Sequence, residues 1–166
     1  MAASRWCWWL SGSVIVLDQL TKFLAETLLI FHQPVPVLPS FNLLLTYNTG
    51  AAFSFLASAG GWQRWFFLGL GSLVSIGLIV WLRRLQPTEK RLVAALALIL
   101  GGAIGNLIDR AWLGQVIDFI QLYYAHWYWP AFNIADSAIT VGATLLVLDS
   151  LWSGRSSNPK TPAGSA

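Results

Sequence analysis

The sequence predicts an all-α membrane protein with four transmembrane helices, and three observations support this prediction. Of the 166 residues, 56% are hydrophobic and only 10% are charged, whereas soluble domains carry roughly a quarter charged residues. Four apolar segments approach the length of roughly 20 residues that crosses a bilayer. Lys and Arg gather in alternate flanks of these segments. A very apolar soluble bundle is disfavoured, because it would leave large apolar patches in water.

The predicted spans cover about residues 6–30, 62–82, 92–108 and 132–152. The third is somewhat short. The first is too long for the apolar region of a cleavable signal peptide, and it contains Asp18, Lys22 and Glu26, which such a region excludes. We expect residues 1–152 to form a single membrane domain. Residues 153–166 are rich in Ser, Pro and Gly, and are predicted to be a disordered cytoplasmic tail.

The distribution of Lys and Arg predicts the orientation of the chain, since short cytoplasmic flanks carry an excess of these residues. If the spans alternate, one side receives Arg5, Arg83, Arg84, Lys90, Arg91, Arg155 and Lys160. Both termini are therefore predicted to be cytoplasmic, and residues 31–61 and 109–131 to lie outside. The basic residues form no clustered nucleic-acid footprint, so no nucleic-acid partner is expected. The single cysteine, Cys7, excludes an internal disulfide.

The two outer segments are predicted to be more than plain connectors. Three prolines in residues 34–40 exclude a helix there, and Phe41–Tyr47 has the Leu, Thr and aromatic content of a short strand before a turn at 48–50. We therefore predict a small extracytoplasmic β element over 41–55. Residues 111–131 are rich in Trp and Tyr, and are predicted to form an interfacial helix or loop.

Ionisable residues at membrane depth are costly and mark candidate functional groups. Asp18 and Lys22 are four apart, so they share a helix face on which opposite charges pair. A purely structural ion pair and a direct functional role both remain open for them. Asp118 lies in an apolar part of the second outer segment. Asp136 lies about one turn into the fourth span, where the helix macrodipole also favours a carboxylate.

The outer side gathers further polar residues around Asp118 and Asp136, namely Asn48, Asn106, Arg110 and Asn133. Two carboxyls held close together can share one proton, because both cannot ionise cheaply at short range. The ionised carboxyl can then activate water while the protonated one donates to a carbonyl oxygen. This is the chemistry of an aspartic peptidase.

Two other functions remain open on these residues alone. A proton-coupled carrier would need its charged groups to form a path across the membrane. A non-enzymatic membrane scaffold would tolerate the loss of either aspartate. Other membrane hydrolases are disfavoured, because the sequence contains neither a His-Glu-x-x-His zinc motif nor a Gly-x-Ser-x-Gly nucleophile motif. His32 and His126 are isolated in the sequence, and are interpreted as interfacial residues rather than metal ligands.

A set of motifs in this order resembles signal peptidase II, the bacterial lipoprotein signal peptidase family. The motifs are DQLTK at 18–22, YNTGAAFS at 47–54, GNLIDR at 105–110, VIDF at 116–119 and FNIADS at 132–137. Each motif alone is weak, but their common order and predicted topology make the resemblance specific. It covers nearly the whole chain as far as the fourth span.

The resemblance implies a membrane aspartic endopeptidase of the bacterial inner membrane, with its active site at the extracytoplasmic face. Such an enzyme removes signal peptides from prolipoproteins by cleaving on the amino side of a diacylglyceryl-modified cysteine. The resemblance implies no metal and no organic cofactor. The expected partners are these substrates, membrane lipids and peptide antibiotics such as globomycin, and the enzyme is expected to act as a monomer.

Taken residue by residue, the resemblance implies that Asp118 and Asp136 are the catalytic pair. The residues expected to bind substrate or support the site are Asn48, Gly50, Asn106, Arg110, Asn133, Asp18 and Lys22. Of these, Asp18 and Lys22 are expected to support the site rather than to act in catalysis.

Overall fold

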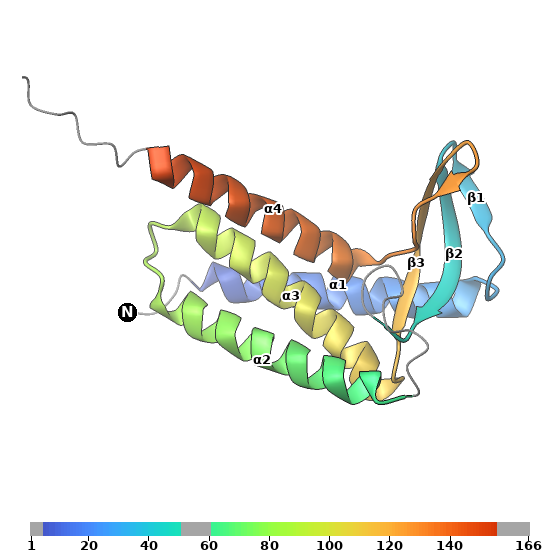
Figure 1. The fold of residues 1–166 in the computed structure, drawn as a ribbon, viewed down its shortest axis with the longest axis horizontal. Helices are drawn as coiled ribbons and strands as arrows, with labels where there is room; N and C mark the ends of the chain where they lie inside the picture. The colour runs from blue at the N-terminus through green and yellow to red at the C-terminus, as the bar shows by residue number, and fades with distance from the viewer. Residues whose placement is uncertain (1–4, 51–60, 156–166) are drawn as a thin grey trace, which may run out of the picture.

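Four long helices stand beside a small antiparallel sheet in the computed structural model of the chain, which describes residues 5–50 and 61–155 (Figure 1). The helices are α1 (Trp6–Leu28), α2 (Gln63–Arg84), α3 (Lys90–Trp112) and α4 (Ile134–Arg155). The strands are β1 (Val35–Leu38), β2 (Phe41–Asn48), β3 (Val116–Tyr124) and β4 (Trp127–Tyr128). The sheet lies at the end of the bundle opposite the α2–α3 connection (Figure 1).

The helices agree with the predicted spans to within a few residues at most of their ends. The helix that contains the third predicted span is longer than that span, because α3 has 23 residues and ends at Trp112 rather than at Ile108. The apolar run stops at Ile108, but Asp109 and Arg110 continue the helix, since both side chains have partners inside the protein. The α4 helix extends into the predicted tail as far as Arg155. Residues 156–166 of that tail lie outside the described residues.

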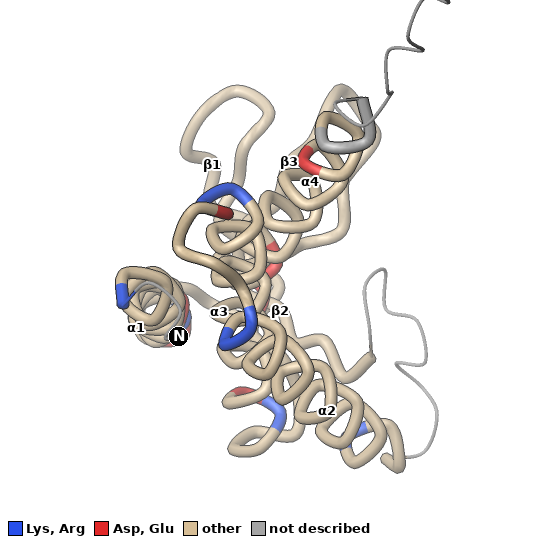
Figure 2. Tube along the Cα trace, turned by 90° about the vertical axis from the view of Figure 1, so that its left-hand side faces the viewer, with Lys and Arg blue, Asp and Glu red and all other residues tan. Residues whose placement is uncertain are grey.

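Within the described ranges, three helices are long and apolar enough to cross a membrane: α2, α3 and residues Ile134–Trp152 of α4. The α1 helix is also 23 residues long, but it carries Asp18, Lys22 and Glu26 and is not among these three. Its Asp18 and Lys22 are nevertheless buried, while Val16, Leu20 and Phe23 are exposed. Seen along the bundle, most of the helical trace carries no charged residue (Figure 2).

Helix α3 lies at the centre of the bundle and packs against α1, α2 and α4 (Figures 1 and 2). Its most apolar window is 56% buried, against 17% for the corresponding windows of α2 and α4. Glycines permit this close packing. A Cβ on Gly101 would lie 2.8 Å from the Cβ of Val14 in α1, and a Cβ on Gly102 would collide with the carbonyl oxygen of Ala135 in α4.

The sheet has the order β1-β2-β3-β4, and all its pairs are antiparallel. Strand β2 confirms the predicted strand, whereas residues 51–55 of the predicted β element lie outside the described residues. The predicted interfacial helix or loop at 111–131 is wrong for most of its length, because β3 and β4 occupy 116–124 and 127–128. The β-branched and aromatic residues of this segment favour a strand, and β2 provides the pairing edge that the sequence did not reveal.

A small apolar cluster attaches the sheet to the helices. Ala25 of α1 packs with Leu45 of β2 and with Ile117 and Phe119 of β3. In addition, Phe132 pairs with Ile120 just before α4 begins. These contacts bring the ends of β2 and α3, the beginning of α4 and the middle of β3 to one place.

The close approach of α3 and α4 predicts a stability difference between two glycine substitutions. Gly102→Ala should lower the free energy of unfolding by about 1–3 kcal/mol, because its methyl group would force α4 away from α3. Gly77→Ala in α2 is the matched control, since a Cβ there meets nothing within 4 Å. Thermal unfolding of both variants in detergent would measure the difference, and equal stabilities would contradict the packing described here.

Candidate active site

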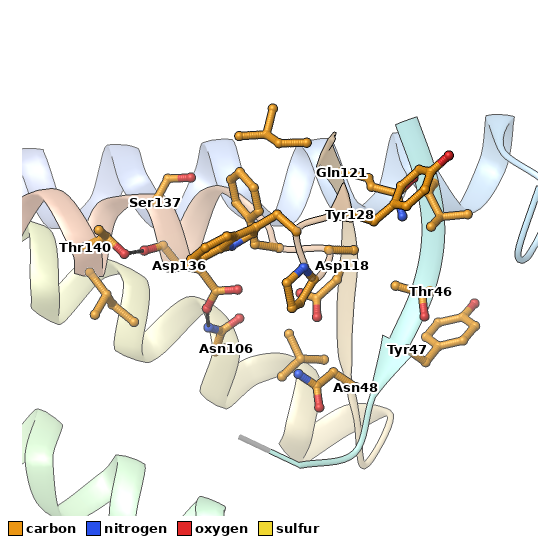
Figure 3. A pocket seen from close by; sticks show the side chains of 18 of the residues that line it. Thr46, Tyr47, Asn48, Asn106, Asp118, Gln121, Tyr128, Asp136, Ser137 and Thr140 are labelled. Carbon is orange, nitrogen blue, oxygen red and sulfur yellow. Dashed lines mark hydrogen bonds between the residues drawn. The ribbon is translucent and has the colours of Figure 1, made fainter. Parts of the chain in front are cut away.

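A cavity of about 1080 Å³ opens where the sheet meets the helix ends. Its walls come from β2, β3, the end of α3 and the beginning of α4 (Figure 3). The predicted site residues that line it are Asn48, Asn106, Arg110, Asp118 and Asp136. Residues separated by up to 88 positions in the sequence, from Asn48 to Asp136, therefore share one chamber.

The two aspartates enter the cavity from different elements, Asp118 from β3 and Asp136 from the first turn of α4 (Figure 3). Asp118 is 3% exposed, and its Oδ1 accepts a hydrogen bond of 2.7 Å from Asn133 Nδ2. Asp136 Oδ1 accepts a hydrogen bond of 2.7 Å from Asn106 Nδ2. Each carboxyl is thus oriented by an amide donor and keeps further oxygen lone pairs available.

The surroundings of Asp118 favour its protonated form. Burial raises the pKa of this carboxyl to about 7, and the nearby charge of Asp136 contributes in the same direction. Hydrogen bonds from Asn133 and Asn48 and the charge of Lys22 oppose this rise in the pKa. A proton on Asp118 is therefore gained and lost close to neutral pH, as a group that exchanges protons during a reaction requires.

Asn133 connects the start of α4 to Asp118. Its Oδ1 accepts from the backbone N–H of Asp136 at 2.8 Å, which makes Asn133 the N-cap of the helix. Its Nδ2 donates to Asp118 Oδ1 and to the carbonyl oxygen of Ile117. The side chain is fully buried and lies behind the cavity wall rather than in it. Asn133 thus contacts both the carboxyl of Asp118 and the backbone of Asp136.

Arg110 holds the end of β2 against α3. Its Nη2 donates to the carbonyl oxygen of Gly50 at 2.8 Å, and its guanidinium lies 5.2 Å from the ring centroid of Phe67. The backbone N–H of Gly50 in turn donates to Asn48 Oδ1 at 2.9 Å, which closes a side-chain turn at the predicted position. Gly50 itself does not line the cavity. Its carbonyl orients Arg110, whose side chain does.

Asp18 and Lys22 lie behind the cavity and not in it. Lys22 Nζ is 2.8 Å from Asp18 Oδ2 and 2.7 Å from Asp109 Oδ2. Asp109 is 3% exposed and was not among the predicted site residues. Its position three residues after Asn106 was a signal that the two share a face of α3. The pairing with Lys22 was not predictable, because it depends on the contact between α1 and α3.

The cavity continues along the sheet, away from the aspartates. Residues there that the sequence did not indicate include His32, Thr46, Gln121 and Tyr128. His32, interpreted from the sequence only as an interfacial residue, lies with Nε2 3.5 Å from Thr46 Oγ1. Within residues 5–50 and 61–155, no group of three His, Cys, Asp or Glu side chains is placed to hold a metal ion.

The chain is similar to known proteins over most of its length. Residues 10–152 match the family described as Signal peptidase (SPase) II. A lipoprotein signal peptidase of Acinetobacter baylyi is 56% identical over 146 residues, which cover 87% of this chain and 82% of that protein. One of Pseudomonas aeruginosa is 53% identical over 150 residues, covering 89% of each. A solved bacterial membrane enzyme, 27% identical, has a TM-score of 0.85 and covers 98% of this chain and 99% of that one.

Proposed function

The chain belongs to the signal peptidase II family, and we propose that Asp118 and Asp136 are its catalytic pair. It is a membrane aspartic peptidase, and its relatives are lipoprotein signal peptidases, so its substrates are prolipoproteins from which it removes the signal peptide. The main support for this pair is that Asp118 and Asp136 line the same cavity. Two carboxyls from separate elements face one chamber, and each is oriented by a buried amide.

In the proposed reaction, one proton is shared between the two carboxyls. The ionised carboxyl removes a proton from a water molecule, whose oxygen attacks the scissile carbonyl carbon. The protonated carboxyl donates its hydrogen to the carbonyl oxygen as the tetrahedral intermediate forms. The carboxyl that took the water proton then passes it to the leaving nitrogen as the C–N bond breaks. The other carboxyl, now ionised, takes a proton back from a hydroxyl of the intermediate, so the pair again holds one proton.

The cavity supports cleavage on the amino side of a lipid-modified cysteine. Toward α4 its wall is partly apolar, with Ile139 and Val141, whereas toward the sheet it carries Thr46, Asn48 and Gln121. We place the signal peptide and the diacylglyceryl chains on the apolar side and the released lipoprotein end beside the sheet. Asn48, Arg110 and the carbonyl of Gly50 would position the peptide, while Asn106 and Asn133 hold the aspartates.

The distribution of buried charge favours a peptidase over a proton-coupled carrier. Lys22 pairs with Asp18 and Asp109, whose carboxylates bond to backbone N–H groups next to Asp118 in β3 and Asp136 at the start of α4. At the other end, the buried cluster contains Cys7, Leu82, Leu85, Val93, Leu96 and Leu100 and is apolar. Among the described residues, the buried charges thus form a local cluster rather than a path across the membrane.

We further propose that α1 is a fourth span, that residues 1–152 form one domain and that both termini are cytoplasmic. The α2–α3 connection carries the basic flank of the bundle (Figure 2), and the sheet lies at the opposite end. The active site would then lie at the extracytoplasmic face of the bacterial inner membrane. One chain supplies all the proposed site residues, which favours a monomer. Globomycin would compete for the same cavity, and membrane lipids would cover the exposed apolar side chains.

Removing either aspartate tests the catalytic pair. Asp118→Asn and Asp136→Asn should each lower kcat for a lipid-modified prolipoprotein by at least about 10³-fold, because neither variant can share a proton between two carboxyls. Asp149→Asn, a substitution far along α4, is the matched control and should retain activity. Cleavage by purified enzymes in detergent measures this, with thermal unfolding to establish that each variant is folded. Parent-like cleavage by either aspartate variant would contradict the assignment.

The raised pKa of Asp118 predicts a pH dependence of activity and stability. As pH rises through about 7, the shared proton is lost, so kcat should fall on the alkaline side. The folded state holds this proton more tightly than the unfolded chain, in which the pKa is near 3.8. Stability from this group is therefore greatest below about 3.8 and decreases as pH rises to about 7. Asp118→Asn should weaken the pH dependence of stability in this interval, and an unchanged dependence would contradict the shift.

Thiol labelling tests the proposed topology. His126→Cys at the sheet and Thr88→Cys in the α2–α3 connection would each be introduced with Cys7→Ser. A membrane-impermeant maleimide should label the cysteine at 126 in intact spheroplasts and the cysteine at 88 only after permeabilisation. Labelling of the cysteine at 88 in intact spheroplasts would overturn the orientation.

A further inference from the structure

Lys22 is bonded to three side chains, each of which also holds one of the two aspartates or the backbone next to it. Its ammonium nitrogen is 2.8 Å from Asp18 Oδ2, 2.7 Å from Asp109 Oδ2 and 3.0 Å from Asn106 Oδ1. An ammonium group has three hydrogens to donate and no lone pair. These three acceptors therefore saturate it, and the side chain is only 2% exposed.

Each carboxylate partner of Lys22 also bonds to the backbone immediately before one of the two aspartates. Asp109 Oδ2 accepts from the N–H of Ile117, which precedes Asp118 in β3, at 3.2 Å. Asp18 Oδ1 accepts from the N–H of Ala135, which precedes Asp136 in α4, at 2.9 Å. The ion cluster thus attaches β3 and α4 to the same point between α1 and α3.

The third partner, Asn106, contacts an aspartate side chain directly. Its Oδ1 accepts from Lys22, and its Nδ2 donates to Asp136 Oδ1 at 2.7 Å. If the amide rotated by half a turn, its NH₂ would face the ammonium group and its oxygen would face the carboxylate. Both new contacts would be repulsive. Asn133 Nδ2 also donates to Asn106 Oδ1, at 3.2 Å, so Lys22 and Asn133 together determine which end of the Asn106 amide Asp136 meets.

We propose that Lys22 is a positioning residue for the reaction, which sets the separation of Asp118 and Asp136 and directs the Asn106 donor at Asp136. This inference rests on the proposed catalytic pair. Lys22, Asp18 and Asp109 do not line the cavity, so Lys22 acts through other residues and does not touch substrate. Gly105 belongs to the same arrangement, because a Cβ there would lie 2.6 Å from Asp18 Oδ2.

A positioning role and a merely structural role predict different kinetics. If Lys22 only stabilises the fold, its loss reduces the amount of active enzyme and leaves KM and the pH profile unchanged. If Lys22 positions the pair, its loss changes the chemical step in the enzyme that remains folded. The pH profile depends on the charged groups that face the pair. Besides Asp118 and Asp136 themselves, these are Asp18, Lys22, Asp109 and Arg110.

The test compares Lys22→Met with Lys90→Met, a control at the exposed start of α3. For folded Lys22→Met we expect kcat to fall about 10–100-fold, as misplacement of reacting groups by about 1 Å does, with KM within about twofold of the parent. The alkaline limb of the kcat profile should move up by about one pH unit. Asp136 loses the directed hydrogen bond from Asn106, and both aspartates lose the nearby positive charge of Lys22. Lys90→Met should keep the parental kcat and profile.

Two further variants keep the test decisive if Lys22→Met does not fold, since it leaves Asp18 and Asp109 without their cation. Lys22→Met combined with Asp109→Asn removes one charge of each sign, so the alkaline limb should again move up, but by less than in Lys22→Met alone. Asn106→Asp keeps the acceptor for Lys22 but presents a second carboxylate to Asp136. Its kcat should be low at neutral pH and recover partly toward acid pH, where the new carboxyl is protonated and can donate.

The outcomes separate the two proposals. If Asp118→Asn or Asp136→Asn cleaves as well as the parent, the catalytic pair itself is wrong, whatever Lys22 does. If both aspartate variants are inactive but the folded Lys22 variants keep the parental kcat, KM and pH profile, the positioning role is overturned and the catalytic pair stands. A reduced kcat with an unchanged pH profile, in proportion to the folded fraction, would likewise overturn the positioning role.

Discussion

Lys22 carries a full charge to a place where water does not reach it, and the geometry of the site follows from the groups that compensate this charge. Removing one partner of a buried ion pair typically costs about 3–5 kcal/mol, because the remaining charge is left uncompensated. Asp18 and Asp109 therefore cannot move independently of Lys22. Because these two carboxylates also accept from the backbone of α4 and β3, the constraint extends from α1 and α3 to the elements that carry the aspartates.

Close packing of the helices is the condition for this ion cluster. Gly105 of α3 faces Asp18, and any larger side chain there would occupy the space of its carboxylate. Gly101 and Gly102 bring α1 and α4 near enough to α3 for side chains on three helices to meet. The small residues of α3 thus have a second effect besides packing, because they shorten the distances over which the buried charges interact. Charges interact more strongly when they are closer together and when the surrounding medium is less polar.

The sequence predicted the helices and several residues that line the cavity, but not most of the contacts among them. Apolar runs predicted the four helices, and ordered motifs led to Asp118, Asp136 and their amide neighbours. The strand at 116–124 was missed, because a segment rich in Tyr and Trp suits an interfacial helix as well as a strand, and its pairing edge in β2 is distant in the sequence. Asp109 was missed for the same reason, since its partner lies on another helix.

The small sheet provides extended backbone beside the helix ends, which a bundle of helices alone does not provide. At the membrane surface, where we propose that cleavage occurs, the peptide bond has to be reached by water, while the lipid attached beside it remains in hydrocarbon. Backbone without helical hydrogen bonds is tolerated at this depth only where other protein groups pair with it. Strands β2 and β3 pair with each other next to the helix ends, so Asp118 can sit on extended backbone opposite the first turn of α4. An aspartate from a strand and an aspartate from a helix thereby line one cavity.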